Sequence, residues 1–530
     1  MLVLLPVLLL FLFALAILVW SQFRPSISYL WLAAAGGSIL AWGLVLGAHW
    51  FNPDPFALPV WQTGLEAPFE LAWELDEFSW PYAFALSSLL LAVMLTESAR
   101  LQEPATPLLW VGSLAVNGAA LLGVMANNPI TMILAWTAID LMEGWVVFSN
   151  ARSAQKIERV ATAFIVRVFG TLMVIWSMSY SASRGAELDF ANIFPDSAIF
   201  LLIAVGLRMG VIPLHVPFTE ELEVRRGLGT LIRFASPASS LVLLGHLPVS
   251  IQLAGSTPLL LSLAAITALY AAIMWASAND AISGRPFWLI SMASVAVSLV
   301  LNGSPQQSVI PGMTLVLLGG VIFLFTQRRQ WMVYLPLAAG LSMAGLPFTP
   351  AAGLYEILAA RPLSLANGLI LLAYALLLFG YLRHTRKLGR EPEILERWLV
   401  VVYPAGLLVL ILGFWALMLI LPASFFTAGV WWAAAMGLGL AVGGVVLQER
   451  YGATLAQRSP WVVAVLRRAG RFSADLLRLD WVYRIGNWVF RVIQRILQFG
   501  VTMLEGDGGV LWAMVLLVLL VSFLYRGGTP

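Results

Sequence analysis

The chain has 530 residues, of which 60% are hydrophobic and only 11% are charged, and its mean hydropathy is +0.89. Soluble globular proteins carry about 25% charged residues, so this composition excludes a water-soluble protein and favours one embedded in a membrane. Cysteine is absent, which excludes disulfides, iron–sulfur clusters and thiolate metal sites, and the histidines show no haem-type pattern, so no cofactor is expected. The net charge of +3 rests almost entirely on arginine, which stays protonated, whereas a buried lysine can release its proton.

Apolar stretches of about 20 residues recur from one end of the chain to the other, and each is long enough to cross a hydrocarbon core of about 30 Å. The first stretch has neither a basic N-terminal region nor a small-residue cleavage site, so we interpret it as a spanning helix rather than a signal peptide. The predicted fold class is therefore an all-α polytopic membrane protein. About sixteen transmembrane helices are expected, over 1–20, 28–48, 79–96, 107–125, 129–149, 160–180, 197–214, 229–246, 257–276, 286–302, 308–327, 331–347, 364–382, 398–421, 428–447 and 509–526.

The arginines between these helices alternate between the two sides of the membrane. Basic loops face the cytoplasm, and this rule places the N-terminus outside the cell membrane. The predicted outer side then has Arg184 and Arg361 and a long acidic loop over 49–78 without Lys or Arg. The predicted cytoplasmic loops carry Arg24, Arg100, Arg152, Lys156, Arg159, Arg225, Arg226, Arg285, Arg328, Arg329 and the basic residues from Arg383 to Arg397.

The segment 448–507 differs from the rest of the chain, because its arginines alternate with apolar residues. This pattern is typical of amphipathic helices that lie in a membrane interface with their arginines toward anionic headgroups. A simple connector that keeps positive charge in the cytoplasm is the alternative. The arginines are Arg450, Arg458, Arg467, Arg468, Arg471, Arg478, Arg484, Arg491 and Arg495.

Ionisable side chains within predicted spans are costly in lipid and therefore mark candidate functional sites. Asp140 and Glu143 lie three residues apart, and so on one face of their helix, and Arg167, Arg208 and Arg233 follow in later spans. We expect Asp140 or Glu143 to pair with Arg208 in mid-membrane. Alternatively, such pairs only hold helices together, because a buried pair costs less than a lone charge.

Prolines beside Arg208 and Glu356 predict that the seventh and twelfth helices are interrupted. Paired broken helices in two halves of a chain indicate inverted repeats, as in transporters. The expected organisation is an N-terminal part over 1–106 with helices 1–3 and the acidic loop, five-helix repeats over 107–250 and 251–390, helices 14 and 15 over 391–447, the interfacial segment 448–507 and a last helix in 508–530.

A series of short stretches carries a family resemblance. They are Leu75–Ser79, Asn127–Trp136, Lys156–Gly170, Arg208 with Pro213, His215 and Glu220, Leu231–Arg233, Ala344–Pro347 and Gly353–Leu358. Their order and spacing resemble the antiporter-like proton-channel subunits of respiratory complex I, Mrp-type sodium/proton antiporters and membrane-bound hydrogenases. The large subunit with extra C-terminal helices is the most similar type. The resemblance implies an ion pathway of Asp140, Glu143, Arg208, His215, Arg233, Arg285 and Glu356, supported by Asp76, Arg167 and Glu220.

Several positions depart from that family pattern. The residue after Trp136 is Thr137 where the family has glutamate, and the sixth-helix aspartate is Gly170. Arg208 and Arg233 replace a lysine and a His or Lys, and the eleventh helix has no titratable group over 312–320. Because arginine resists deprotonation, Arg208 and Arg233 should act as fixed charges while the carboxylates titrate.

Two main hypotheses follow for function. The first is an ion-translocating subunit, for H⁺ or Na⁺, whose partners are other membrane subunits that supply any redox or antiport chemistry. The second is a non-pumping scaffold subunit of such a complex, and a transport partner in inorganic-carbon uptake is a third alternative. Under the first hypothesis Glu356→Gln should abolish proton flux. The chain itself is at most a non-redox subunit of an enzyme complex, and nucleic acid is not an expected partner.

Overall fold

A computed structural model gives the fold of the chain. Its described residues form two compact units, Met1–Val463 and Ala464–Pro530. They cover 2–23, 26–61, 69–101, 106–150, 154–185, 189–190, 193–215, 225–326, 329–360, 364–387, 396–421, 430–458, scattered positions over 485–498, and 507–526. Glu220 and most of the predicted interfacial segment therefore lie outside the described residues.

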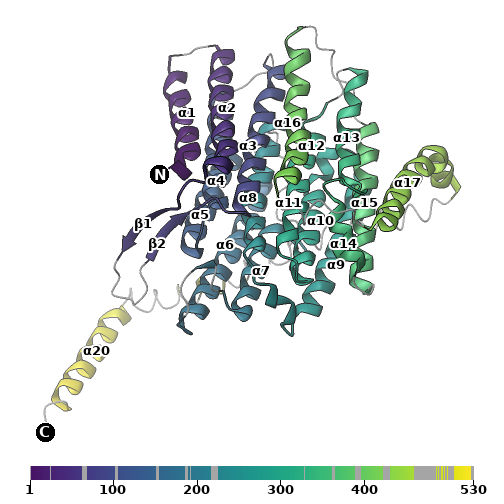
Figure 1. Cartoon of the computed structure of the whole chain (residues 1–530). Coiled ribbons are helices and arrows are strands. Elements are labelled where there is room, and N and C mark those ends of the chain that lie inside the picture. The colour runs from purple at the N-terminus through teal and green to yellow at the C-terminus, as the bar shows by residue number, and fades with distance from the viewer. Residues whose placement is uncertain are drawn as a thin grey trace. The chain divides into compact units, whose positions relative to one another are not determined.

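The first unit is a bundle of membrane-length helices with one small hairpin (Figure 1). Its first helices are α1 (Leu5–Ser21), α2 (Ile27–Phe51), α3 (Ser79–Glu97), α4 (Pro107–Val124), α5 (Pro129–Asn150), α6 (Ala154–Ala182), α7 (Pro195–Met209) and α8 (Arg226–Gly245). The next are α9 (Thr257–Ser277), α10 (Ala281–Leu301), α11 (Val309–Met313), α12 (Gly319–Leu324), α13 (Tyr334–Met343), α14 (Ala352–Ala360), α15 (Leu365–Lys387), α16 (Leu399–Ile420) and α17 (Trp431–Arg458).

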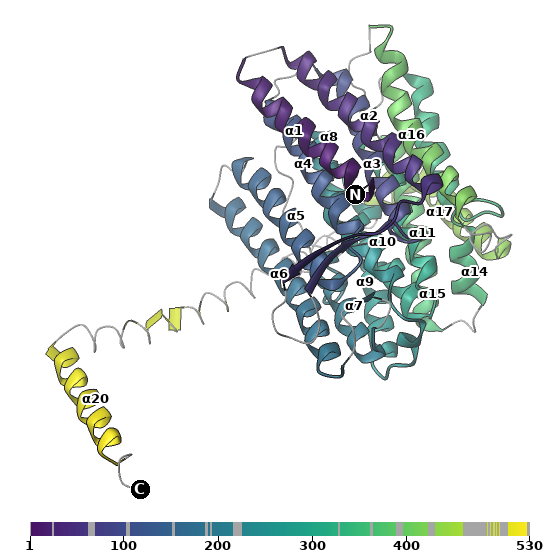
Figure 2. The same cartoon turned by 60° about the vertical axis from the view of Figure 1, so that its left-hand side comes forward.

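The described residues contain 13 helices that are long and apolar enough to cross a membrane, which confirms a polytopic α-helical membrane protein. The predicted count of about sixteen is not confirmed. Three predicted spans account for the difference. α7 has only 15 residues, and the span 331–347 is interrupted. The predicted span 509–526 corresponds to α20 (Asp507–Arg526), of which the side chains are described over Ala513–Ser522. Within the first unit, α5 and α6 lie on one flank and α15 and α17 on the other (Figure 2).

Both helices expected to be broken are interrupted. α7 ends at Met209, where Gly210 takes a φ of +73°, a left-handed conformation that favours glycine. α13 ends at Met343, and Gly345, with a φ of +68°, begins the turn that leads into α14. A further irregularity occurs between α11 and α12, which a π-helical turn over Thr314–Leu318 joins. That the two halves are inverted repeats stays a prediction.

The acidic loop predicted over 49–78 contains a β-hairpin. β1 (Phe56–Trp61) pairs antiparallel with β2 (Phe69–Trp73), with Phe56 opposite Trp73. The hairpin is tied to the turn between α4 and α5, because the amide of Asn127 donates to the carbonyl of Ala72 over 3.0 Å. The sequence analysis did not predict these strands. They are short, and they lie within a segment that its acidic residues identified only as a loop.

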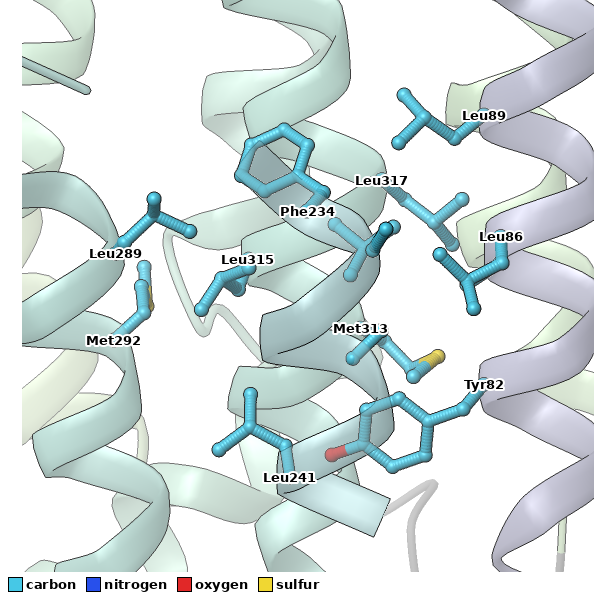
Figure 3. Close-up of a cluster of buried hydrophobic side chains, with 14 of the residues drawn as sticks. Tyr82, Leu86, Leu89, Phe234, Leu241, Leu289, Met292, Met313, Leu315 and Leu317 are labelled. Carbon is cyan, nitrogen blue, oxygen red and sulfur yellow. The ribbon is translucent and has the colours of Figure 1, made fainter. Parts of the chain in front are cut away.

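A cluster of mainly apolar side chains, which we call the apolar junction, lies where α8 meets the second half of the bundle, and the hydroxyl of Tyr82 is the polar atom among its labelled members (Figure 3). α3, α8, α10, α11 and the π-helical turn each contribute side chains that are at most 1% exposed. Because lipid tails are as apolar as leucine, close packing rather than transfer out of water stabilises such a cluster within a membrane. The labelled members are Tyr82, Leu86, Leu89, Phe234, Leu241, Leu289, Met292, Met313, Leu315 and Leu317.

At the C-terminal side, α17 is longer than predicted and continues to Arg458. The prediction ended this helix at residue 447 because charged residues begin there, but helical propensity is not lost at Gln448, Glu449 and Arg450. Glu449 Oε1 accepts a hydrogen bond of 2.6 Å from Arg386 of α15, which anchors this extension.

Candidate functional site: a buried charge cluster

Two carboxylates of α5 face the interior of the first unit. Asp140 is 4% exposed and Glu143 is 3% exposed, and their spacing of three residues places both on the side of α5 that faces α6 and α7. Leu141 and Trp145, by contrast, are exposed on the outer side of the same helix. Buried carboxylates need partners, because desolvating a charge costs several kcal/mol per ion.

Arg208 is the partner of Asp140. Its Nη1 donates to Oδ2 of Asp140 over 2.7 Å and its Nη2 to Oδ1 over 2.8 Å, a bidentate ion pair with no exposed surface on the arginine. Ser236 and Ser240 of α8 each accept a further hydrogen bond of 3.2 Å from the guanidinium. The ring of Trp136 stacks against it at 4.3 Å. The expected pairing of Arg208 with an α5 carboxylate is therefore present, and groups of both α5 and α8 hold the arginine.

Arg167 of α6 connects the two carboxylates. Its Nη1 donates to Oδ1 of Asp140 over 3.2 Å and also makes a short ion pair with Oε2 of Glu143. Asp140, Glu143, Arg167 and Arg208, which we call the buried charge cluster, thus contain two carboxylates and two guanidiniums. With all four ionised the cluster is neutral, which lowers the cost of its burial.

A glycine makes room for this arrangement. A Cβ on Gly170 would lie 2.8 Å from Cγ of Arg208 and 3.1 Å from the carbonyl oxygen of Ala204, which is closer than side chains pack. A side chain at this position would meet the aliphatic stem of Arg208 as it lies here. Gly170 therefore allows the close approach of α6 to α7 at the buried arginine.

A cavity of about 40 Å³ adjoins the cluster, which is room for roughly three water molecules. Asp140, Glu143 and Arg167 line it together with Arg233 of α8. Its remaining lining residues are Gly144, Val147, Val160, Ala163, Phe164 and Ile232, whose side chains bear no polar atom. The charged groups therefore determine what this cavity binds.

Other predicted pathway residues lie apart from the cluster. His215 is buried, with Nδ1 2.7 Å from the carbonyl oxygen of Pro213. Arg285 is buried and donates from Nη1 to Oγ1 of Thr230 over 3.1 Å. Glu356 is exposed on α14. The structure thus brings together four of the predicted residues, adds Arg233 at the cavity, and leaves Glu356 at the surface.

Asp76 acts at the beginning of α3. Its Oδ1 accepts hydrogen bonds from the amides of Phe78, over 3.0 Å, and Ser79, over 2.6 Å, so it caps the helix. Its Oδ2 lies 3.6 Å from Nε2 of His246, at the end of α8.

Burial lowers the pKa of His246, and the carboxylates of Asp76, Asp189 and Glu77 oppose that shift. Burial, together with Asp76 and Asp189, raises the pKa of Glu74.

Sequence reasoning missed a third buried acid, which lies apart from Asp140 and Glu143. Glu97, at the end of α3, is 1% exposed and accepts hydrogen bonds from the amide of Gly227 over 3.1 Å, from Arg225 over 3.2 Å and from Arg100 over 3.4 Å. It joins the end of α3 to the beginning of α8. Its spacing of three residues from Arg100 was the signal available in the sequence.

Known proteins resemble this chain in both sequence and fold. No established protein-family profile matches the chain. In sequence it is 23% identical over 294 residues to NADH-ubiquinone oxidoreductase chain 2 of Struthio camelus, covering 50% of this chain and 83% of the relative. The same protein of Gallus gallus is 22% identical over 198 residues, covering 36% of this chain and 55% of the relative.

Solved structures share the fold at lower identity. A chain of the membrane-bound sulfane sulfur reductase, an archaeal respiratory membrane complex, superposes with a TM-score of 0.68 at 13% identity, over 98% of this chain and 100% of that one. A chain of the Mrp complex from Dietzia sp. DQ12-45-1b gives 0.66 at 15% identity and covers 94% of this chain, which spans 63% of that longer chain. Respiratory complex I from Thermus thermophilus gives 0.58 at 18% identity, over 80% of this chain and 100% of that one.

The sequence likeness and the fold both point to membrane subunits of respiratory and Mrp complexes. That the large subunit with extra C-terminal helices is the most similar type stays a prediction. The chain is thus similar, in sequence and in fold, to the antiporter-like membrane subunits that its motifs predicted.

Proposed function

We propose that this chain is a membrane subunit of a complex I-like or Mrp-like assembly and translocates protons, or Na⁺, through the buried charge cluster. The observation that carries this proposal is the contact of Asp140, Glu143 and Arg167 with a cavity large enough for water. Buried ionisable groups that border water-accessible space in a membrane protein are typical of ion pathways. Partner subunits would supply the redox or antiport reaction that drives the movement.

The chemistry assigns different tasks to the two kinds of charged group. Arg208 has no exposed surface and is surrounded by acceptors, so it serves as a fixed positive charge paired with Asp140. The carboxylates are the groups of the cluster that can gain and lose a proton at moderate cost. Water in the cavity would carry the proton to and from the carboxylates that line it, Asp140 and Glu143.

A non-pumping scaffold subunit is the second candidate, and the second half of the bundle favours it. Within the described part of 251–390 no Asp or Glu is buried, since Glu356 and Asp280 are both exposed. The apolar junction also borders α8 directly. If the chain is an ion-translocating subunit, the proton path is confined to the first half of the chain or is completed by a partner subunit.

The proposed setting is the cell membrane. The N-terminus would lie outside, and the Arg-rich segment 448–507 would lie in the cytoplasmic interface, as the distribution of basic loops predicts. Other membrane subunits would be the partners, because similar folds occur in multisubunit membrane complexes.

The test compares ion flux in the complete complex. The purified complex is reconstituted into vesicles, and internal pH or Na⁺ is followed while the complex works. Asp140→Asn removes the partner of Arg208 and should abolish flux while size-exclusion chromatography still shows an intact complex. Glu449→Gln, in the exposed pair with Arg386, is the matched control and should leave flux unchanged. Full flux in Asp140→Asn would favour the scaffold.

A further inference from the structure

The four charges of the cluster are not equivalent in their hydrogen bonds. Oδ1 of Asp140 accepts from both Arg208 and Arg167, and Oδ2 accepts from Arg208, so each of its oxygens is engaged by a guanidinium. A proton on Asp140 would have to displace one of these charge-assisted bonds. Such bonds are about twice as strong as neutral ones. Neither oxygen of Asp140 is therefore free of a guanidinium.

Glu143 is in the opposite situation. Its Oε2 is paired with Arg167, but its Oε1 is buried and has no hydrogen-bond partner among the residues that the structure describes. The side chain also lines the cavity. A buried oxygen without a partner is costly unless water or a proton satisfies it. Glu143 can thus accept a proton from the cavity without losing a bond at Oε1.

Arg167 connects the protonation of Glu143 to the rest of the cluster. The same nitrogen, Nη1, donates to Oε2 of Glu143 and to Oδ1 of Asp140. When Glu143 becomes neutral, its attraction for this guanidinium falls, and Asp140 is the remaining carboxylate within reach. The charged groups that face Glu143 are Asp140 on its own helix, Arg167 on α6, Arg208 on α7 and Arg233 on α8.

We propose that Glu143 is the proton-accepting group of the site and that Arg167 is a positioning residue that moves between Glu143 and Asp140 as Glu143 is protonated. This inference rests on the proposed function and deepens it. In the step itself, hydronium in the cavity transfers a proton to Oε1, an O–H bond forms on the carboxyl group, and a water molecule remains. Asp140 and Arg208 stay paired throughout, and Arg167 is the residue that changes its partner.

The first experiment measures proton flux in vesicles that hold the complete complex. Glu143→Gln imitates the protonated side chain permanently and should lower flux about a hundredfold, the low end of the contribution of a positioned proton-transfer group. Glu143→Asp should restore part of the flux, because it keeps a titratable carboxyl. Glu449→Gln controls for the loss of a carboxylate elsewhere.

The second experiment separates positioning from mere stabilisation. Arg167→Gln removes the charge that favours ionised Glu143, so the pH of half-maximal flux should rise by at least about one unit, the usual influence of a close opposite charge. Arg167→Lys keeps the charge and should shift that pH less. A structural role for Arg167 would change the amount of assembled complex and leave the pH profile in place.

Infrared difference spectra recorded against pH give a readout that needs no flux. The complex should show the carbonyl stretch of a buried protonated carboxyl that grows as pH falls and is missing in Glu143→Gln. The inference is wrong if that band persists in Glu143→Gln or if this variant conducts with an unchanged pH profile. Failure of the unmodified complex to conduct any ion would instead overturn the proposed function.

Discussion

The two halves of the bundle differ in what they bury. The first half, α4 to α8, holds the buried charge cluster and its cavity. The second half, α9 to α15, buries tryptophan, tyrosine, phenylalanine and leucine around the π-helical turn, and its buried polar side chains are largely serine, threonine and asparagine. Asn302 and Asn367, joined by a hydrogen bond of 3.2 Å, are typical of these neutral contacts. Each half contains a broken helix, yet among the described residues only the first half buries carboxylates together with guanidiniums, whereas the second buries Arg285 and Arg383 without a carboxylate.

α8 forms the boundary between these two environments. Ser236 and Ser240, four residues apart, face Arg208, whereas Phe234 and Leu241, seven residues apart, face the apolar junction (Figure 3). One helix therefore separates a polar interior from an apolar one. In the second half the buried arginines bond to neutral oxygens instead: Arg285 donates to the hydroxyl of Thr230, and Arg383 donates to the carbonyls of Ala276 and Ala278. The comparison shows that charge is kept where partners exist.

The largest expected effect comes from leaving one charge of the cluster alone. Arg208→Met keeps much of the side-chain volume but leaves Asp140 and Glu143 with Arg167 as the remaining guanidinium. We expect a loss of about 3–5 kcal/mol in the free energy of unfolding, as for other broken buried pairs. The thermal unfolding midpoint of the purified complex in detergent measures it.

The double variant Arg208→Met with Asp140→Leu sharpens this prediction. It leaves the neutral pair of Glu143 and Arg167 and should recover most of the lost stability, because apolar groups of similar volume replace a buried ion pair at little cost. Additive losses in the two single variants would show that Arg208 and Asp140 are not energetically coupled.

A change in the apolar junction should affect stability without affecting transport. Leu289 is fully buried, and Leu289→Ala would leave a cavity that costs about 3 kcal/mol. Proton flux per assembled complex should stay at the unmodified level, since the apolar junction contains no charged group among its labelled members. A selective loss of flux would mean that the second half takes part in conduction after all.

Much of this architecture could be predicted from the sequence. Runs of apolar residues locate the spans, and Gly210 and Gly345 lie at the two breaks that nearby prolines had indicated. The spacing of Asp140 and Glu143 placed both on one face, and the pairing with Arg208 followed from the cost of burying a lone charge. These inferences succeed because a lipid environment leaves few alternatives to helices with paired internal charges.

Other features depend on three-dimensional packing. Which α5 carboxylate binds Arg208 is decided by helix rotation, and the bridging position of Arg167 follows from the close approach that Gly170 allows. The exposure of Glu356 depends on the direction in which α14 leaves its turn, and the sequence motif around it gives no information on that direction. The hairpin of β1 and β2 lies in a loop whose hydropathy resembles neither a span nor a regular strand.

A smaller effect is expected where α8 ends. Burial holds the pKa of His246 below its ordinary value of 6.5, so the folded chain binds fewer protons than the unfolded chain in that range. Stability should therefore be greatest above about pH 6.5 and fall as pH decreases through that value. His246→Gln should remove this part of the pH dependence of the unfolding midpoint. An opposite slope would mean that Asp76, 3.6 Å away, outweighs burial.

The smallest effect should come from Glu356, which the sequence placed in the ion pathway. Its side chain is exposed on α14, so it is not part of the buried charge cluster and does not affect the net charge of that cluster. We expect Glu356→Gln to change the free energy of unfolding by at most about 0.5 kcal/mol, as for most surface substitutions. Proton flux should equal that of the unmodified complex, whereas Glu143→Gln, measured in the same vesicles, should lose it. If Glu356→Gln abolishes flux in a fully assembled complex, a partner subunit must cover α14 and complete a second path there, and the contrast between the two halves would then hold only for the isolated chain.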